Sequence, residues 1–156
     1  MERARVRTSR RQRGQSLVEA AFVIPLLLFL ILAIVDLGRL AFAWVTVQYA
    51  AGAGARFAVT GVGEQNGTRL GLIKQAAKRW SDLLPGQNAH INVRSWRGRR
   101  ASGAARENNA GGPCDLVEVE VLYTYRTITP IVGRLIPPIQ FRGRERMVNE
   151  RWGTCD

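Results

Sequence analysis

An uncharged apolar run from Ala20 to Val35 constrains this chain more than any other feature of its sequence. The run lies within LVEAAFVIPLLLFLILAIVDLG, from Leu17 to Gly38, in which Leu, Ile, Val, Phe and Ala predominate. A helix needs about 20 apolar residues to cross the hydrocarbon core of a bilayer. We therefore expect one membrane-spanning helix, bent near Pro25 because proline removes a backbone donor.

The segment before the apolar run is strongly basic. Residues 1–14 hold six arginines and one glutamate, a formal charge of +5 out of the +11 of the whole chain. Basic flanks of a membrane helix stay on the cytoplasmic side. We therefore expect residues 1–14 to be a cytoplasmic leader, and the C-terminal region to lie outside the cytoplasm.

Two other functions are compatible with a basic N-terminus followed by an apolar run. A basic arm can bind nucleic acid, but the chain has no zinc-finger spacing and no RNA-binding aromatic motif, so no nucleic-acid partner is expected. A cleaved secretory signal has an apolar region of about 7 to 15 residues, shorter than the run here. The small residues from Ala50 to Ala55 resemble a signal cleavage site, but the sequence before them continues without a turn signal.

Glu19 is an acidic residue near the start of the predicted membrane-spanning segment. A charged side chain near the bilayer interior costs about 2.5 to 3.5 kcal/mol on insertion scales, so an intramembrane acid suggests a function. The alternative without a functional role is that the Glu19 carboxylate extends to the headgroup region of the bilayer. The functional interpretation requires a cationic partner.

The helix is expected to continue beyond the membrane surface to about Ala58, because residues 40–59 contain no proline and are rich in Ala, Val and aromatic residues. Asp36 and Arg39 are three residues apart, so they share a helix face and form a predicted pair at the membrane interface. Trp44 and Tyr49 follow where an aromatic belt would lie. We assign residues 15–60 to this transmembrane and extended helix.

Residues 61–156 are predicted to form one small extracytoplasmic α+β domain, in which a helix covers an antiparallel sheet of about three strands. The segment TRLGLIKQAAKRWSDLL has apolar residues at helical spacing, including Ile73 and Trp80, with Thr68 as the N-cap.

The strand candidates are residues 89–96, 116–127 and 139–149. In the second, valines alternate with Glu118 and Glu120, which predicts one buried and one exposed face. Residues 97–113 are expected to be an exposed, mobile connection, and prolines 130, 137 and 138 to mark a long turn.

The two cysteines stand at the ends of predicted neighbouring strands. Cys114 precedes the second strand and Cys155 follows the third, so antiparallel pairing would bring them together. An even number of cysteines fits an oxidising compartment, and we favour a disulfide over two free thiols. A metal site would have only His90 as a further soft ligand, and the usual paired cysteine spacing is absent, so no metal site is expected.

Catalysis has little support in the sequence. The chain has one histidine, no recognisable nucleophile motif and no phosphate-binding loop. We interpret Glu118 and Glu120 as the exposed face of a strand, and His90 as an ordinary strand or surface residue. We therefore expect no enzymatic activity, no catalytic residue and no cofactor.

The N-terminal third of the chain resembles the TadE-like (TadE/TadG) pseudopilins of tight-adherence, or Flp, pili, within the type IV pilin superfamily. The resemblance rests on RGQSLVEAAFVIPLLLFLILAIVDLGRLAF and YAAGAGARFAVTG, which lie between Arg13 and Gly61. It implies a pilin-like fold and a noncatalytic minor pseudopilin that works in the inner membrane with other pilins and an assembly platform. The family often has an aromatic residue after the glutamate, whereas this chain has Ala20.

The resemblance also implies that a prepilin peptidase cuts between Gly14 and Gln15. Such a cut would create an α-amine four residues before Glu19, and an α-amine with a pKa of about 7.7 to 8 is largely cationic near neutral pH. It could pair with Glu19 of its own chain or of a neighbouring subunit, and in the superfamily the intersubunit pair is the usual proposal for an assembly contact. The second hypothesis is an unprocessed, single-pass membrane scaffold of the same envelope assembly.

Overall fold

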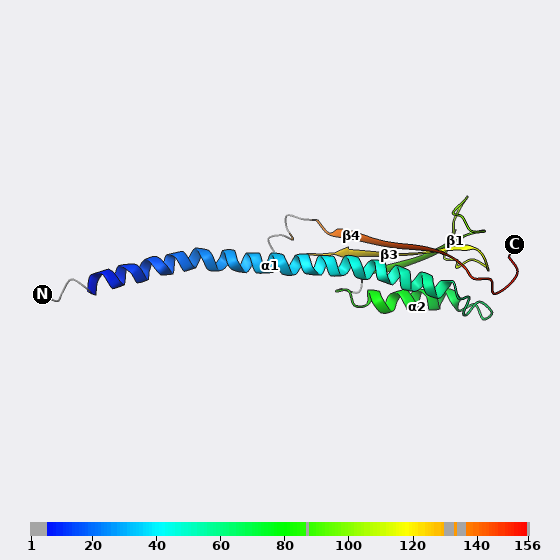
Figure 1. Ribbon diagram of the computed structural model, residues 1–156, viewed down its shortest axis with the longest axis horizontal. Coiled ribbons are helices and arrows are strands. Elements are labelled where there is room, and N and C mark those ends of the chain that lie inside the picture. The colour runs from blue at the N-terminus through cyan, green and yellow to red at the C-terminus, as the bar shows by residue number, and fades with distance from the viewer. Residues whose placement is uncertain (1–5, 87, 130–132, 134–136, 156) are drawn as a thin grey trace. The chain divides into compact units, whose positions relative to one another are not determined.

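In the described part of the chain, two helices and four strands follow one another (Figure 1). The computed structural model describes residues 6–86, 88–129, 133 and 137–155, and side chains from Gly14 onward. Residues 1–5 of the predicted leader and Pro130 of the predicted turn lie outside the described residues. The elements are α1 (Val6–Ala58), α2 (Arg69–Ser81), β1 (His90–Trp96), β2 (Arg106–Glu107), β3 (Leu116–Tyr125) and β4 (Ile139–Val148).

The first helix contains the whole apolar run and has Pro25 inside it. It begins at Val6, before the expected start at Gln15, and ends at Ala58, where the sequence predicts its end. The chain divides into two structural units, residues 1–39 and residues 40–156.

The second unit contains a four-stranded antiparallel sheet in the order β2-β1-β3-β4. The three predicted strands are present with ends within two residues of those expected. The fourth strand, β2, lies in the segment expected to be an exposed connection. It pairs with the end of β1 through Arg94 with Glu107 and Ser95 with Arg106. The α+β prediction is thus confirmed, with one short strand added.

One face of the sheet is covered by the C-terminal part of α1 and by α2 (Figure 1). The inward residues of β3 include Val117, Val119 and Val121, which have no exposed surface, as their alternation predicts, followed by the buried Tyr123 and Tyr125. Small residues on α1 face them, which allows the helix backbone to lie close to the sheet. The buried core combines Ala43, Val47, Ala50, Ala51 and Ala55 of α1 with Ile73, Ala77, Val93, Val117, Val119 and Val121.

Glycines mark the two closest approaches in this core. A Cβ atom on Gly54 of α1 would lie 3.0 Å from Val119 Cγ1 and 3.1 Å from Ala77 Cβ. A Cβ atom on Gly143 of β4 would overlap the carbonyl oxygen of Val47. The helix and the edge strand are therefore in contact through their backbones at Gly143.

The second helix begins after the predicted N-cap residue, but its capping contact and its buried face differ from those expected. Thr68 occupies the N-cap position, but its side chain makes no capping bond and its hydroxyl instead donates to Asn66 Oδ1. Trp80, expected on the buried face, is 40% exposed and packs edge-on against Tyr49 of α1 at 4.5 Å between ring centroids. The residue buried in its place is Ser81, which is small enough to face the sheet.

Replacing Gly143 with alanine should destabilise the second unit. The new methyl group would meet the backbone of α1, which cannot rotate away, so we expect a loss of about 2 to 3 kcal/mol, the upper range for overpacking. The measurement is urea unfolding of the full chain in detergent, followed by near-ultraviolet circular dichroism. Gly71→Ala is the control, because a Cβ at Gly71 meets no atom within 4 Å. Equal stability of the two variants would contradict the backbone contact.

Candidate functional site

The predicted processing and assembly residues lie on the exposed surface of α1. Gly14, Gln15 and Glu19 are all exposed, and a Cβ on Gly14 would meet no atom within 4 Å. From Gly14 onward the helix is long and apolar enough to cross a membrane, and its most apolar window has none of its residues buried in the protein. An apolar surface of this extent needs an apolar environment outside the chain. The single apolar helix therefore indicates membrane anchoring.

The predicted interface pair is close in space. Arg39 Nη1 lies 3.9 Å from Asp36 Oδ1, and the two residues are one helical turn apart. This separation is the outer limit of an ion pair, and such pairs on one helix stabilise it by about 0.3 to 0.5 kcal/mol. The geometry is compatible with the predicted role at the membrane surface and does not itself locate that surface.

The predicted cysteine partners form a disulfide. Cys114 and Cys155 are joined, with Cα atoms 5.6 Å apart. The bond ties the C-terminal segment to the start of β3, because Cys155 is 41 residues from Cys114 in sequence. Closing a loop of this length contributes about 3 to 4 kcal/mol in the chain-entropy model.

The outward face of the sheet carries an ionic cluster that the sequence interpretation missed. We expected Glu118 and Glu120 to be exposed, and this expectation is wrong, because Glu118 has no exposed surface and Glu120 is 7% exposed. Arginines from both neighbouring strands lie over them. The cluster, called here the arginine face, consists of Glu118, Glu120, Arg94, Arg142, Arg144 and Arg146.

The pairing register explains this burial. Glu118 stands between Arg94 on β1 and Arg146 on β4, and bonds to both. Glu120 accepts a bond of 3.0 Å from Arg144 and has Arg142 Nε at 3.3 Å. Buried carboxylates are tolerated only when paired in this way.

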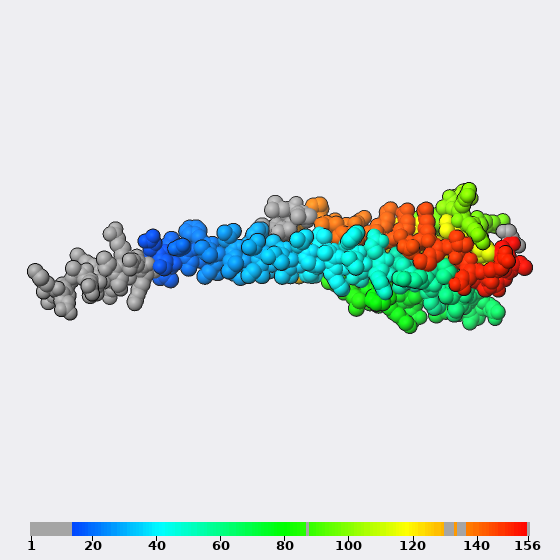
Figure 2. Space-filling view, viewed as in Figure 1, coloured from blue at the N-terminus to red at the C-terminus, as the bar shows by residue number. Residues whose placement is uncertain are grey.

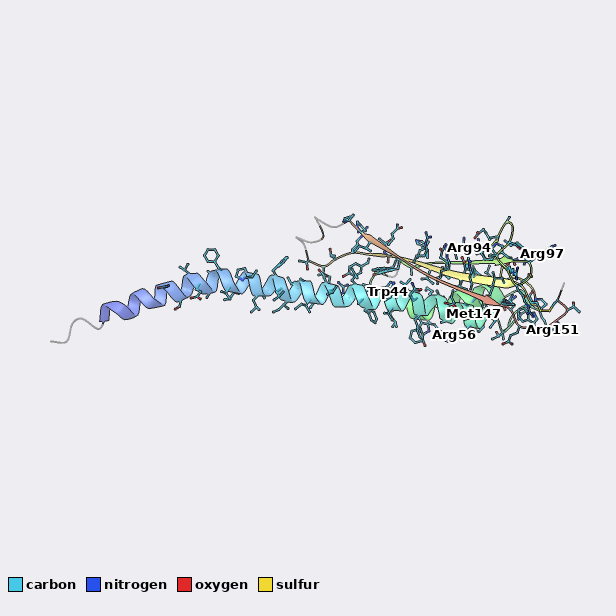
Figure 3. All side chains as sticks on the ribbon, turned by 45° about the horizontal axis from the view of Figure 1, so that its top comes forward. Trp44, Arg56, Arg94, Arg97, Met147 and Arg151 are labelled. Atoms are coloured by element: carbon cyan, nitrogen blue, oxygen red, sulfur yellow. A yellow bond between two sulfur atoms is a disulfide. The ribbon has the colours of Figure 1, made fainter. Side chains whose placement is uncertain are left out.

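An aromatic side chain extends the same surface. Trp96 lies beneath two guanidinium groups, at 5.8 Å from Arg94 and 5.3 Å from Arg146 between the guanidinium carbon and the ring centroid. Figure 3 shows Arg94 on the side of the sheet away from α1, whereas Met147 lies on the helix side. The sheet therefore has one apolar face under helices and one face covered by arginines.

The charges of the arginine face shift its titration. Burial acts to raise the pKa of Glu120, but bonds from Arg144 and Asn92, with the charges of Arg94 and Arg142, outweigh it and lower the pKa. The pKa of Arg144 is raised, first by its bond to Glu120 and then by the charge of Glu118. Both shifts favour the ionised forms of Glu120 and Arg144.

A second polar cluster is centred on Arg69, the first residue of α2. Its guanidinium donates to the carbonyl oxygens of Ala58 at 2.8 Å and Gly111 at 2.5 Å, and to Glu64 at 2.9 Å. It also lies 4.5 Å above the ring of Trp152. Arg69 therefore joins the end of α1 to two loops and the C-terminal segment, a role that no local sequence pattern indicates.

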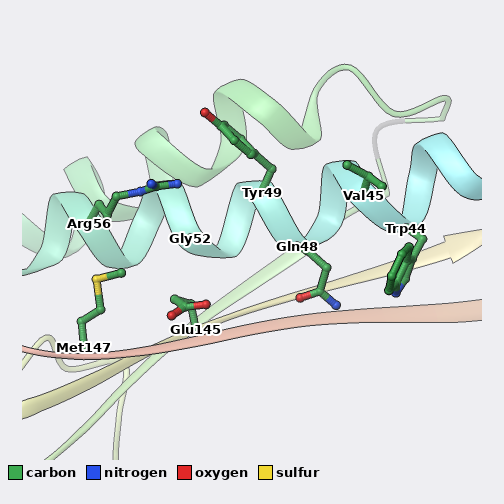
Figure 4. A pocket seen from close by; sticks show the side chains of 8 residues that line it. All are labelled: Trp44, Val45, Gln48, Tyr49, Gly52, Arg56, Glu145 and Met147. Carbon is green, nitrogen blue, oxygen red and sulfur yellow. The ribbon is translucent and has the colours of Figure 1, made fainter.

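A groove runs between α1 and β4 (Figure 4). Its volume is about 440 Å³, and Trp44, Val45 and Tyr49 of α1 line it while remaining half exposed. The remaining lining residues are Gln48, Gly52 and Arg56 of α1 with Glu145 and Met147 of β4. The groove is mostly apolar and open, and its charged lining residues are Glu145 and Arg56. Such a surface can bind a polypeptide, but it holds no nucleophile paired with a base.

Among the described residues, no three His, Cys, Asp or Glu side chains come together as metal ligands. His90 is exposed at the start of β1. The arrangements that the described part of the chain does offer are an exposed apolar helix, an ionic sheet face and an apolar groove.

Comparison with known proteins connects the first of these arrangements to a family. Residues 14–56 match the family of TadE-like proteins. The match begins at Gly14 and ends inside α1, so it covers most of the segment from Arg13 to Gly61 on which the resemblance rests and confirms it there. The match suggests that the chain is a component associated with Tad pili. The TadE-like family is a structural family, not one known for catalysis. No curated protein and no solved structure matches the chain.

Acid should weaken the second unit through the arginine face. Because the folded pKa of Glu120 is depressed below its ordinary value of 4.5, its stabilising effect is present above that value and is lost as pH falls through the folded pKa. We expect the free energy of unfolding to decrease between about pH 5 and pH 3. The measurement is urea unfolding of the full chain in detergent at several pH values.

The matched control for the acid experiment is Glu120→Gln, which keeps the shape of the side chain but cannot titrate. Its stability should be lower at neutral pH and should change less on acidification than that of the unmodified chain. Asp115, whose pKa is also lowered although burial opposes it, accounts for part of the remaining change through its bonds to Gly112 and Arg106. An identical pH dependence in both proteins would contradict the role of Glu120.

Proposed function

We propose that this chain is a noncatalytic minor pseudopilin of a tight-adherence pilus or a related secretion system. It is anchored in the inner membrane by α1, with the leader in the cytoplasm and residues 61–156 outside. A prepilin peptidase removes residues 1–14, and the mature chain then joins other pilins at the membrane assembly platform. The observation that carries this proposal is the TadE-like match to residues 14–56, which starts at the expected cleavage position.

The local structure at Gly14 is compatible with cutting there. Glycine inside a helix costs about 1 kcal/mol relative to alanine, so Gly14 weakens the helix locally where a protease must bind extended backbone. Gly14 also presents no side chain to a narrow cleft. The arginines that precede it fix the cut on the cytoplasmic side.

Glu19 gains a cationic partner through the cut. In the helical register of α1, Gln15 and Glu19 share one face, and both are exposed. The new α-amine of Gln15 pairs with Glu19 of a neighbouring subunit, which lowers the cost of keeping both charges in lipid. The pair thereby selects the axial register of the subunits during assembly.

The alternative is an unprocessed single-pass scaffold of the same envelope assembly. It shares the anchor and the outer domain with the pseudopilin, but it keeps the arginine leader. The departure that favours it is Ala20, which stands where the family often has an aromatic residue. The two functions differ in the N-terminus of the mature chain.

The mature protein should begin at Gln15. We expect Edman sequencing of the chain purified from native membranes to start at this residue, and Gly14→Val to retain the leader because the branched side chain blocks the cleft. Gly38→Val is the control, since Gly38 is also an open helical glycine with no atom within 4 Å of an added Cβ. Retention of the leader in the unmodified chain would support the scaffold instead.

Loss of the Glu19 carboxylate should impair assembly without impairing insertion. We expect Glu19→Gln to reduce the amount of this chain recovered with sheared pili by at least about tenfold, the effect of losing about 1.4 kcal/mol. Carbonate extraction should leave it in the membrane fraction. Val18→Ala, which changes the adjacent exposed residue, is the control. Normal recovery of the Glu19→Gln chain would exclude the register contact.

A further inference from the structure

The sheet ends in a long strand that has a neighbour on one side only. In the strand order of the described residues, β4 pairs with β3 and is terminal, while the opposite edge is the two-residue β2. The strand has ten residues, and any part of such an edge that is left open is a ready template for pairing with another chain. Figure 2 shows β4 at the molecular surface, in orange to red, beside the cyan part of α1.

One hydrogen bond fixes which backbone groups of β4 face this edge. The carbonyl oxygen of Arg142 accepts a bond of 3.1 Å from Gln48 Nε2 of α1, so it points away from β3. In an antiparallel pair, residues alternate between those that bond to the neighbour and those that point outward. Arg144 and Arg146 therefore direct their N–H and C=O groups to the open edge. Gln48 closes the edge at one end and leaves this stretch available.

The groove lies directly beside this open stretch (Figure 4). Glu145 and Met147 of β4 point toward α1 and form its floor, and Gly52 of α1 leaves space opposite them. A strand added to β4 would direct every second side chain toward this face. Those side chains would lie against Trp44, Tyr49 and Met147, which favours apolar residues.

The other side chains of an added strand would lie beside the arginine face. Arg142, Arg144 and Arg146 of β4 stand on that face and keep 61%, 38% and 46% of their side chains exposed. Opposite charges on neighbouring strands are favourable, and like charges are unfavourable. The added strand should therefore alternate apolar residues with acidic ones.

A second copy of this chain does not satisfy these conditions through its own β4. Antiparallel pairing of two β4 strands would place Arg142, Arg144 and Arg146 of both copies on the same face of the sheet, where like charges on neighbouring strands are unfavourable. Parallel pairing would turn the copy over and place its Arg144 and Arg146 in the apolar groove beside Arg56. The occupant is therefore a different polypeptide segment.

We propose that the edge of β4, together with the α1–β4 groove, is a docking site for an extended segment of a partner protein in which apolar and acidic residues alternate. The segment adds a strand beside Arg144 and Arg146 and inserts its apolar side chains between α1 and β4. Backbone bonds supply affinity, and the groove with the arginine face supplies specificity. The site belongs to residues 40–156 and does not depend on cleavage after Gly14.

The test uses the full chain in detergent and a fluorescent peptide in which glutamate and valine alternate. We expect this peptide to bind at least about tenfold more tightly than a peptide of the same composition with the valines and glutamates in separate blocks. A peptide N-methylated at every second amide, which has the same charge but cannot pair with the edge, should lose binding. Fluorescence anisotropy at fixed ionic strength measures all three.

Two variants locate the binding on the protein. Gly52→Leu fills the groove, since a Cβ at Gly52 meets only Arg56 Nη2 at 3.5 Å, and should weaken binding about tenfold. Gly71→Leu makes the same change on the open surface of α2 and should leave binding unchanged. Equal binding of the three peptides, or of the two variants, would overturn the proposal. So would a dimer of the chain alone that Gly52→Leu converts to a monomer.

Discussion

The close approach of α1 to the sheet is the contact on which the outer domain depends. Residues 43–55 of α1 present alanines and glycines to a row of valines on β3, and Gly143 lets the edge strand touch the helix backbone at Val47. Small residues on both sides bring the two layers together with little side-chain entropy lost. The core is thin, and its stability comes from close packing rather than from large side chains.

The arginine face buries the outer side of the sheet, as the helices bury the inner side. No helix covers Glu118 and Glu120 in the described part of the chain, and both are nevertheless buried, beneath arginines whose apolar stems and guanidinium groups exclude water. Removing one partner of a buried ion pair is costly because the other charge remains. The two faces of the sheet therefore constrain the sequence differently. The inner face requires side chains of the right volume, and the outer face requires acidic residues matched by arginines.

Features that depend on local patterns could be predicted from the sequence. The apolar run predicted α1, alternating valines predicted β3, and the positions of Cys114 and Cys155 relative to the strands favoured a disulfide. The features that were missed depend on neighbours distant in the chain. The burial of Glu118 requires the register that places Arg94 and Arg146 beside it, and the role of Arg69 requires loops whose positions follow only from the fold.

Trp80 was misassigned for a related reason. Helical periodicity marks a face but does not say how far around the helix the core extends, and here Ala77 and Ser81 are buried whereas Trp80 is 40% exposed. Tyr49 and Trp80 then meet at the margin of the core. The half-exposed aromatic residues of α1 continue this margin toward the groove.

The TadE-like family matches α1 but not the strands and α2, and a physical difference between these two parts of the chain accounts for this. A helix surrounded by lipid and other helices must satisfy similar constraints in every member of an assembly, so its sequence pattern is general. The docking site proposed for the β4 edge and its groove has to fit only one partner, so its chemistry can differ from one chain to the next provided that the core beneath it is kept. In this chain α1 serves both requirements, because the stretch from Trp44 to Arg56 supplies the core on one side and the groove on the other. A substitution there would therefore act on folding or on recognition according to the side of the helix on which it falls.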